Sequence, residues 1–107
     1  MENPIPATLP PEWGVRLAMN EVLEELAKAT RKYPTWPTDP LHALAVLGEE
    51  FGELTQAVLQ RTYEPDKTSL AHVREEAVQT AAMALRFLLS LERYEYERSA
   101  QHCQDAS

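Results

Sequence analysis

Three glutamates occur within one and a half helical turns of this chain, in the run Leu47-Gly48-Glu49-Glu50-Phe51-Gly52-Glu53-Leu54. Side chains three and four residues apart on a helix are neighbours, so these carboxylates can point into one small volume. Carboxylates held this close repel one another unless a cation lies between them, and a hard divalent cation suits oxygen ligands. The spacing therefore indicates one wall of a metal site on a helix.

A second acidic turn follows further along the chain, in the run Arg74-Glu75-Glu76-Ala77-Val78-Gln79. If the two turns lie on adjacent antiparallel helices joined by a short connection, Glu50 and Glu53 can face Glu76 and Gln79 across a cleft. Helical geometry turns Glu49 further outward, which suits a second metal or an outer role. A lone acidic pair, such as Glu24-Glu25, is typical of a solvated face.

A carboxylate-bridged di-iron bundle also sets glutamates on facing helices, and it is a rival interpretation. That class uses Glu-x-x-His pairs, and no histidine of this chain follows a glutamate by three residues. Magnesium-dependent activity of an iron-free protein would exclude it.

The elements that must position these glutamates are helices. Four prolines predict an extended arm over residues 1–11. Apolar residues at helical spacing predict a helix from about 12 to 33, which the prolines at 34, 37 and 40 must end. Asp39 before Pro40 predicts the start of a second helix, from about 40 to 62. A third helix is expected from about 69 to 98, with Asp66 or Thr68 as its cap, and a flexible tail over 99–107. The helical domain would thus span residues 12–98.

The apolar spacing of the second and third helices predicts their core faces. The second helix has the stripe Leu44, Leu47, Phe51, Leu54 and Val58, and the third has Leu70, Val73, Ala77, Ala81, Ala84, Leu88 and Leu91. A polar-edged row should lie beside the second of these stripes, formed by His72, Glu76, Gln79, Met83 and Arg86.

Residues 80–91 are apolar nearly all round, which predicts burial on more than one face. Gly48 and Gly52 indicate the close approach of another helix, or of a ligand, on their side of the second helix. The fold class expected is all-α: three main helices per chain, completed as a four-helix-type core by dimerisation.

Composition excludes several classes of function. The chain has 107 residues, a formal net charge of −7 and no marked cluster of Lys and Arg, which argues against a nucleic acid polymer as partner. No apolar run is long enough to span a membrane, and the N-terminus lacks the features of a signal peptide, so the expected location is cytoplasmic. The single Cys103 cannot form an internal disulfide and is expected to be a free surface thiol.

Residues 36–91 resemble the MazG-like family of all-α nucleoside triphosphate pyrophosphohydrolases. The family pattern is Glu-Glu-x-x-Glu on one helix and Glu-x-x-Asp on the next. The first half is complete here, and the second half carries Gln79 where aspartate is expected. The resemblance implies Mg²⁺, with Mn²⁺ as a substitute, held by Glu50, Glu53 and Glu76 with Gln79 in the place of the fourth ligand. It also implies cleavage of a nucleoside triphosphate to the monophosphate and pyrophosphate.

In such a site Glu49 would orient the attacking water or hold a second ion, and the protein would be a homodimer or a dimer of dimers. Trp36 could stack on a nucleobase or anchor its loop over the end of the bundle. Arg86 could meet the phosphates or form an ion pair between subunits. Lys32 is a further candidate for a phosphate contact. The alternative function, which Gln79 favours, is a non-catalytic dimeric bundle of the same fold that binds a nucleotide or a protein partner.

Overall fold

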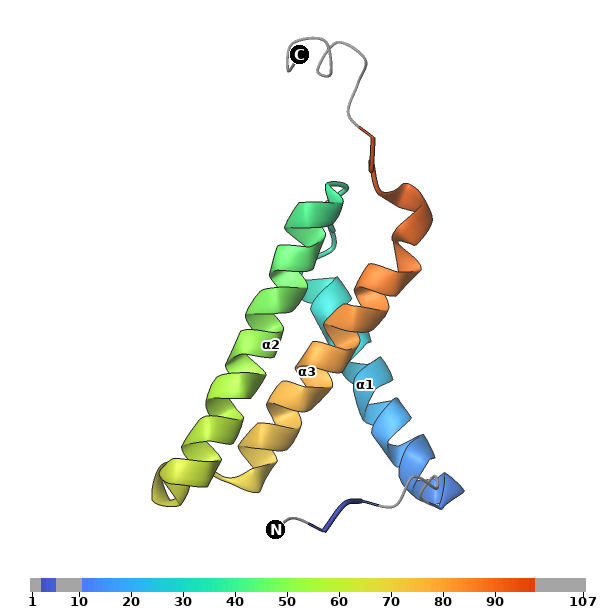
Figure 1. The fold of residues 1–107 in the computed structure, drawn as a ribbon. Coiled ribbons are helices and arrows are strands. Elements are labelled where there is room, and N and C mark those ends of the chain that lie inside the picture. Colours follow the sequence, from blue (N-terminus) through green and yellow to red (C-terminus); the bar gives the residue numbers. More distant parts are fainter. Residues whose placement is uncertain (1–2, 6–10, 98–107) are drawn as a thin grey trace.

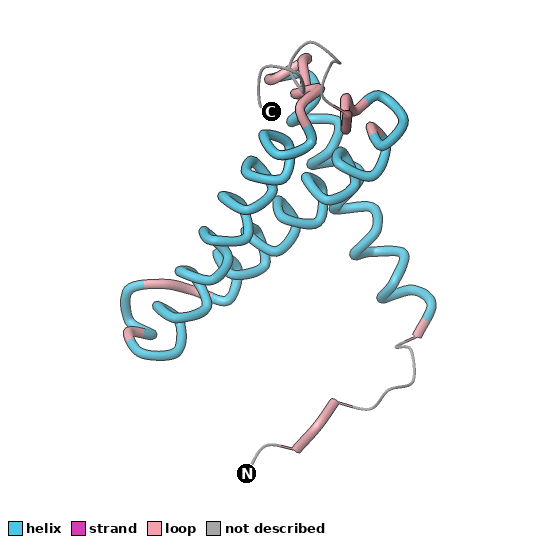
Figure 2. Tube along the Cα trace, turned by 45° about the horizontal axis from the view of Figure 1, so that its top comes forward, coloured by secondary structure: helices cyan, strands magenta, loops and turns pink. Residues whose placement is uncertain are grey.

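The computed structural model describes residues 3–5 and 11–97. The range 11–97 forms helices joined by short loops, and no strand occurs among the described residues (Figures 1 and 2). The all-α prediction is therefore confirmed for this part of the chain. Most of the predicted arm over 1–11, the whole tail over 99–107 and Cys103 lie outside the described residues. The elements are α1 (Glu12–Lys32), α2 (Pro40–Tyr63), the 3₁₀ turn η1 (Pro65–Lys67), α3 (Leu70–Leu89) and the 3₁₀ turn η2 (Leu91–Arg93).

Capping side chains set the starts of α2 and α3. The Asp39 carboxylate accepts a hydrogen bond from the Leu41 amide at 2.9 Å, with Pro40 at the first helical position, as the sequence predicts. The cap of α3 is Ser69, whose hydroxyl accepts from the His72 amide at 3.2 Å. The expectation that Asp66 or Thr68 caps this helix is wrong, because η1 takes up the residues before it.

The third helix ends at Leu89, well before the predicted Arg98. The hydroxyl of Ser90 donates to the Arg86 carbonyl at 3.0 Å, which helps close the last turn. After η2 the chain turns back towards the start of α2, where the Glu95 amide donates to the Thr38 carbonyl at 2.9 Å. Propensity alone continues the helix, but tertiary contacts of the following residues end it.

The three helices do not form a closed bundle. α2 and α3 run antiparallel and pack side by side, and α1 packs against α3 (Figure 1). α1 makes no comparable contact with α2, and the two helices diverge from the loop that joins them. A space lined by all three helices is therefore left between α1 and α2.

The face of α2 that turns inward differs from the predicted stripe. Ala43 and Ala57 are buried and Glu50 and Leu54 are half-buried. Three members of the predicted stripe are exposed instead: Leu44 (53%), Phe51 (60%) and Val58 (45%). The other two members, Leu47 and Leu54, are half-buried, so the inward face of α2 combines one edge of the predicted stripe with the carboxylate edge.

In α3, too, the inward face is turned from the predicted apolar stripe towards its polar edge. The predicted polar-edged row supplies most of the inward residues, since Met83 and Arg86 are buried and Glu76 and Gln79 are half-buried. Its first member, His72, is exposed. Leu70, Ala84 and Leu88 of the predicted core stripe are exposed. The apolar arcs of both helices extend beyond what a single chain covers.

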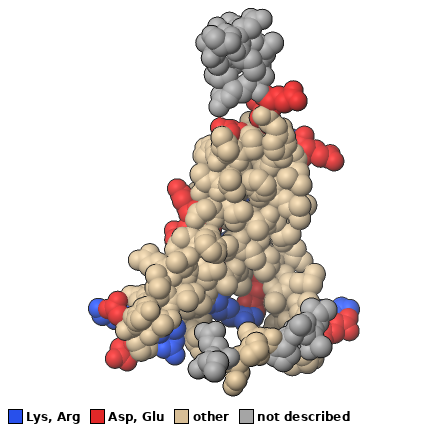
Figure 3. Space-filling view, viewed as in Figure 1, with Lys and Arg blue, Asp and Glu red and all other residues tan. Residues whose placement is uncertain are grey.

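The outer face of α2 and α3 is consequently broad and poor in charge. Figure 3 shows few Lys, Arg, Asp or Glu side chains across the middle of this face. No large side chain of the described residues is fully buried. A Cβ added at Gly48 or Gly52 would meet no atom within 4 Å, so the predicted close approach of another helix is not made within the described part of the chain. None of the helices that the structure describes is long and apolar enough to cross a membrane.

Candidate metal centre and adjoining pocket

Glu50 and Glu53 of α2 meet Glu76 of α3 at the contact between these helices. One carboxylate oxygen from each residue lies within 4.8 Å of the other two. Glu50 and Glu76 are half-buried, and Glu53 is exposed. The antiparallel pairing predicted from the sequence thus brings the three glutamates together.

The half-buried carboxylates keep free acceptor atoms. Glu50 Oε2 and Glu76 Oε2 are both shielded from solvent and accept no hydrogen bond. An unpaired buried acceptor is costly, and a cation with hard-oxygen preference removes that cost. The Thr80 hydroxyl lies against the backbone behind the cluster, 2.8 Å from the Glu76 carbonyl and 3.1 Å from the Glu50 carbonyl. Thr80 therefore links the two helices at the site without occupying the carboxylates.

Burial and neighbouring carboxylates raise the proton affinity of Glu50 and Glu76. Burial, followed by the charges of Glu53 and Glu76, raises the pKa of Glu50 above its usual value. Burial and then the charge of Glu53 raise the pKa of Glu76, although His72 opposes this shift. Glu25, on α1, adds a weaker repulsion on Glu50. The metal-free site therefore holds negative charge at a cost that a bound cation would offset.

Without a divalent ion, the free energy of unfolding is expected to fall as the pH rises. An acid whose pKa is higher in the folded than in the unfolded state contributes stability below its unfolded pKa, near 4.5, and loses it as pH rises through the folded pKa. Glu21 has the opposite effect on the pH dependence of stability. Arg74 lowers its pKa in the folded state, so its contribution is present above its unfolded pKa and is lost as the pH falls through its folded pKa. Urea unfolding in EDTA between about pH 5 and pH 7 would measure the effect.

Added magnesium should reverse this slope, since the ion binds the ionised carboxylates. The double variant Glu50→Gln/Glu76→Gln is the control and should flatten both profiles. Profiles that run parallel to those of the wild type would show that these two glutamates do not cause the pH dependence.

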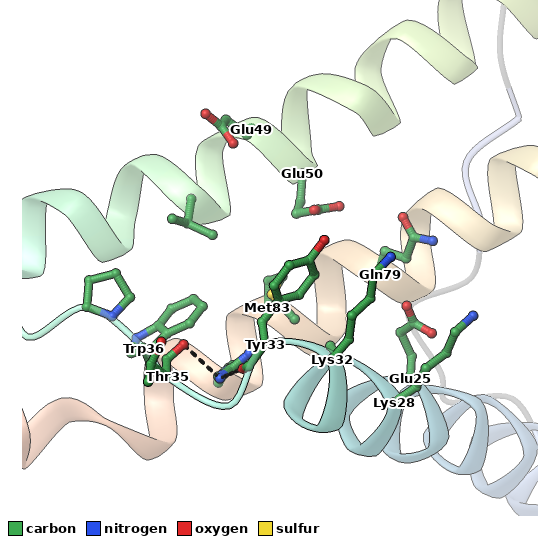
Figure 4. Close-up of a pocket in the computed structure, with 14 residues that line it drawn as sticks. Glu25, Lys28, Lys32, Tyr33, Thr35, Trp36, Glu49, Glu50, Gln79 and Met83 are labelled. Atoms are coloured by element: carbon green, nitrogen blue, oxygen red, sulfur yellow. Dashed lines mark hydrogen bonds between the residues drawn. The ribbon is translucent and has the colours of Figure 1, made fainter.

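A pocket of about 510 Å³ opens beside the cluster, between α1 and α2, with α3 as its floor. Figure 4 shows Glu50 and Gln79 reaching into it from α2 and α3, while Lys32 extends towards them from α1. Lys28 lies one turn before Lys32 on the same helix. The α2 side of the pocket is thus acidic, and the α1 side carries two ammonium groups together with the Glu25 carboxylate.

Glu49 and Gln79 also line this pocket. Glu49 is exposed, and Figure 4 shows its carboxylate on the opposite side of α2 from that of Glu50, in agreement with its predicted outer position. Gln79 is half-buried on α3, one turn after Glu76. All of the predicted ligand residues are therefore at the cluster or in the pocket next to it.

Trp36 and Arg86 lie at the end of the pocket that is lined by the loop between α1 and α2. Arg86 is 8% exposed, and its guanidinium donates to the carbonyls of Tyr33 and of Thr35, the latter at 3.1 Å. The same guanidinium lies 5.0 Å from the centre of the Trp36 ring. Arg86 is thus engaged by its own chain, and neither of its predicted roles, phosphate binding and an ion pair between subunits, is needed to satisfy it.

Sequence reasoning missed three residues of this region: Glu25, Lys28 and Tyr94. Lys28 and Lys32 are four residues apart on a helix, a spacing that could have indicated a shared basic face. Glu25 enters the pocket only because α1 lies across α3. The sequence predicts a continuing helix through Tyr94, so no local pattern indicates its contact with Trp36.

Comparisons with family models, with curated proteins and with solved structures found no match to this chain.

Proposed function

We propose that this chain is a magnesium-dependent nucleoside triphosphate pyrophosphohydrolase. The observation that carries the proposal is a cluster of three glutamate oxygens within 4.8 Å of one another, beside a pocket whose other wall holds Lys28 and Lys32. A triphosphate is a ligand that needs both a metal ion and ammonium groups. The resemblance of Glu49-Glu50-Phe51-Gly52-Glu53 to the MazG-like pattern supports the same activity.

The residues present fit a magnesium ion. Glu50, Glu53 and Glu76 would hold it, because their oxygens are hard donors and two of the buried oxygens have no other partner. Magnesium supplies charge neutralisation on phosphate oxygens and lowers the pKa of a bound water. Gln79 would offer an amide oxygen near the same ion.

The remaining groups of the pocket would bind and orient the substrate. Lys28 and Lys32 would contact the phosphates, and the half-buried Trp36 at the loop end of the pocket would meet the nucleobase. The exposed carboxylate of Glu49 would accept a hydrogen bond from the attacking water and orient it towards the phosphorus. Attack at the α-phosphorus breaks its bond to the bridging oxygen, so that pyrophosphate leaves.

The test is to incubate the full chain with ribo- and deoxyribonucleoside triphosphates, with magnesium or manganese, and to measure the pyrophosphate released. We expect release that depends on the divalent ion and is abolished by EDTA. No release from any nucleotide with either ion would refute the proposal.

Gln79 favours the second candidate function, a non-catalytic bundle that binds a nucleotide or a protein partner. With an amide at position 79 the site has three carboxylates, whereas aspartate there would give it four. The loss of one negative charge weakens metal binding. Gln79→Asp is therefore expected to lower the magnesium concentration for half-maximal activity about tenfold, equivalent to roughly 1.4 kcal/mol. Magnesium titrations of the two proteins would measure this change.

Gln56→Asp is the matched control, because Gln56 is exposed on α2 and does not line the pocket. If Gln79→Asp loses activity while its magnesium requirement is unchanged, the Gln79 amide contacts the substrate and not the metal ion. Activity that appears only in Gln79→Asp would favour the non-catalytic function for the natural chain.

We infer that a second copy of the chain covers the outer face of α2 and α3. This face exposes Leu44, Phe51 and Val58 together with Leu88, and it carries little charge (Figure 3). Burying such side chains contributes about 25 cal/mol per Å² of apolar surface. Gly48 and Gly52 leave room for the close approach of a helix on this face. The protein is thus proposed to act as a homodimer, or as a dimer of dimers.

A further inference from the structure

The segment after α3 is built into the wall of the pocket. Trp36 Nε1 donates a hydrogen bond to the Tyr94 hydroxyl at 2.7 Å, and this hydroxyl donates to the Phe87 carbonyl at 3.1 Å. Tyr94 is only 6% exposed, and its ring lies 5.0 Å from that of Phe87. The indole of Trp36 is thus held by its edge from an element that is remote in sequence.

Arg86 holds the same indole from another direction. Its guanidinium lies over the Trp36 ring and also donates to two carbonyls of the loop, those of Tyr33 and Thr35. The Glu95 amide adds a backbone hydrogen bond to the Thr38 carbonyl at 2.9 Å, on the other side of Trp36 in the loop. Each end of the loop is therefore attached to α3 or to the segment that follows it.

We propose that Tyr94 and Arg86 are positioning residues that hold the Trp36 indole as the stacking surface for the nucleobase, a role that rests on the proposed function. Stacking on an aromatic ring is worth about 1–3 kcal/mol per base in other proteins. A ring that is already held in place loses less conformational entropy when the base binds. Trp36 lines the pocket, but Tyr94 does not. Tyr94 therefore acts on the substrate through Trp36 alone.

The test uses tryptophan emission and steady-state kinetics of the full chain. The chain has two tryptophans, and Trp13 is 72% exposed at the start of α1, so Trp13→Phe leaves Trp36 as the single reporter. In this background Tyr94→Phe keeps the aromatic ring and removes the hydroxyl. Tyr96→Phe is the matched control, because the Tyr96 hydroxyl donates to the Leu91 carbonyl at 3.2 Å, and Phe keeps the ring that packs edge-on against Tyr94 at 5.8 Å.

Tyr94→Phe is expected to shift Trp36 emission to longer wavelength and to increase its quenching by acrylamide. It should raise KM for the preferred triphosphate about fivefold, the effect of one lost hydrogen bond, while kcat changes by less than about twofold. Inhibition by inorganic tripolyphosphate, which has no base, should be unchanged. Tyr96→Phe should alter none of these quantities, and Arg86→Lys should resemble Tyr94→Phe.

A lower melting temperature with unchanged emission and unchanged KM in Tyr94→Phe would overturn the proposal and leave Tyr94 a stabilising residue only. An unchanged KM in Trp36→Leu would overturn it as well, while the pyrophosphohydrolase activity stood. If the wild type releases no pyrophosphate, the proposed activity fails, and the positioning of Trp36 is then tested by nucleotide binding.

In that case α,β-imido-ATP should quench Trp36 emission, tripolyphosphate should not, and the quenching should be weaker in Tyr94→Phe. No quenching by α,β-imido-ATP would overturn the proposed role of Tyr94 and Arg86.

Discussion

Glu53→Gln is expected to reduce magnesium-dependent pyrophosphate release about a thousand-fold, which corresponds to a loss of roughly 4 kcal/mol of transition-state stabilisation. Glutamine has nearly the same size as glutamate, but it removes one of the three negative charges at the Glu50–Glu53–Glu76 cluster. Its amide nitrogen also cannot act as a ligand for magnesium. Single-turnover assays at saturating nucleotide would separate this loss from weaker substrate binding.

Glu53→Gln should raise the stability of the metal-free protein, although it lowers the activity. Without metal, removing one charge relieves the repulsion on Glu50 and Glu76, although solvent screens part of it. We expect the melting temperature in EDTA to rise by about 2–4 °C, equivalent to roughly 0.5 kcal/mol in a domain of this size. The further rise that magnesium gives to the wild type should disappear.

Glu75→Gln provides the control, because Glu75 is an exposed neighbour of Glu76 that does not belong to the cluster. It should keep both the activity and the stabilisation by magnesium. Pyrophosphate release unchanged by Glu53→Gln would contradict the assignment of the metal site and, with it, the proposed activity.

Phe51→Glu is expected to dissociate the proposed dimer. Phe51 lies in the middle of the exposed stripe of α2 and is 60% exposed in the single chain. A carboxylate at this position would lose the buried area of the ring and would have to be desolvated against apolar neighbours. We expect the dimer dissociation constant to rise more than a hundred-fold, for a loss of about 3 kcal/mol.

Sedimentation equilibrium over a range of concentrations would measure this change, and circular dichroism would show whether the separated chain remains helical. Gln56→Glu adds the same charge to the polar side of α2 and should leave the dimer intact. A wild type that is monomeric at all concentrations, or an unchanged constant in Phe51→Glu, would refute the proposed interface.

Local signals in the sequence were sufficient for most of the helices. Pro34 and Pro40 bracket the loop between α1 and α2, and Asp39 caps α2 as predicted, because these effects act within one turn of the backbone. The end of α3 was not predictable in the same way. Residues after Leu89 have good helical propensity, but Tyr94 gains more from packing on Phe87 and from its bond with Trp36.

The choice of buried face could not be read from apolar spacing. The stripe through Leu44, Phe51 and Val58 was expected to face the core of the chain, yet it is exposed, and Glu50 and Glu76 turn inward. Spacing shows which residues avoid water, but a helix with a wide apolar arc can bury one part of it within the chain and offer the rest to a partner.

The glutamates at the centre of this protein illustrate the division between sequence and tertiary structure. Their spacing alone determined that Glu50 and Glu53 share one side of a helix, because 3.6 residues make one turn. That Glu76 joins them within 4.8 Å follows from the antiparallel packing of α2 on α3. That Lys28 and Lys32 line the same pocket as Glu50 follows from α1 packing on α3 and not on α2. These contacts join residues remote in the chain, and only the packing of whole helices, which no local pattern encodes, selects them.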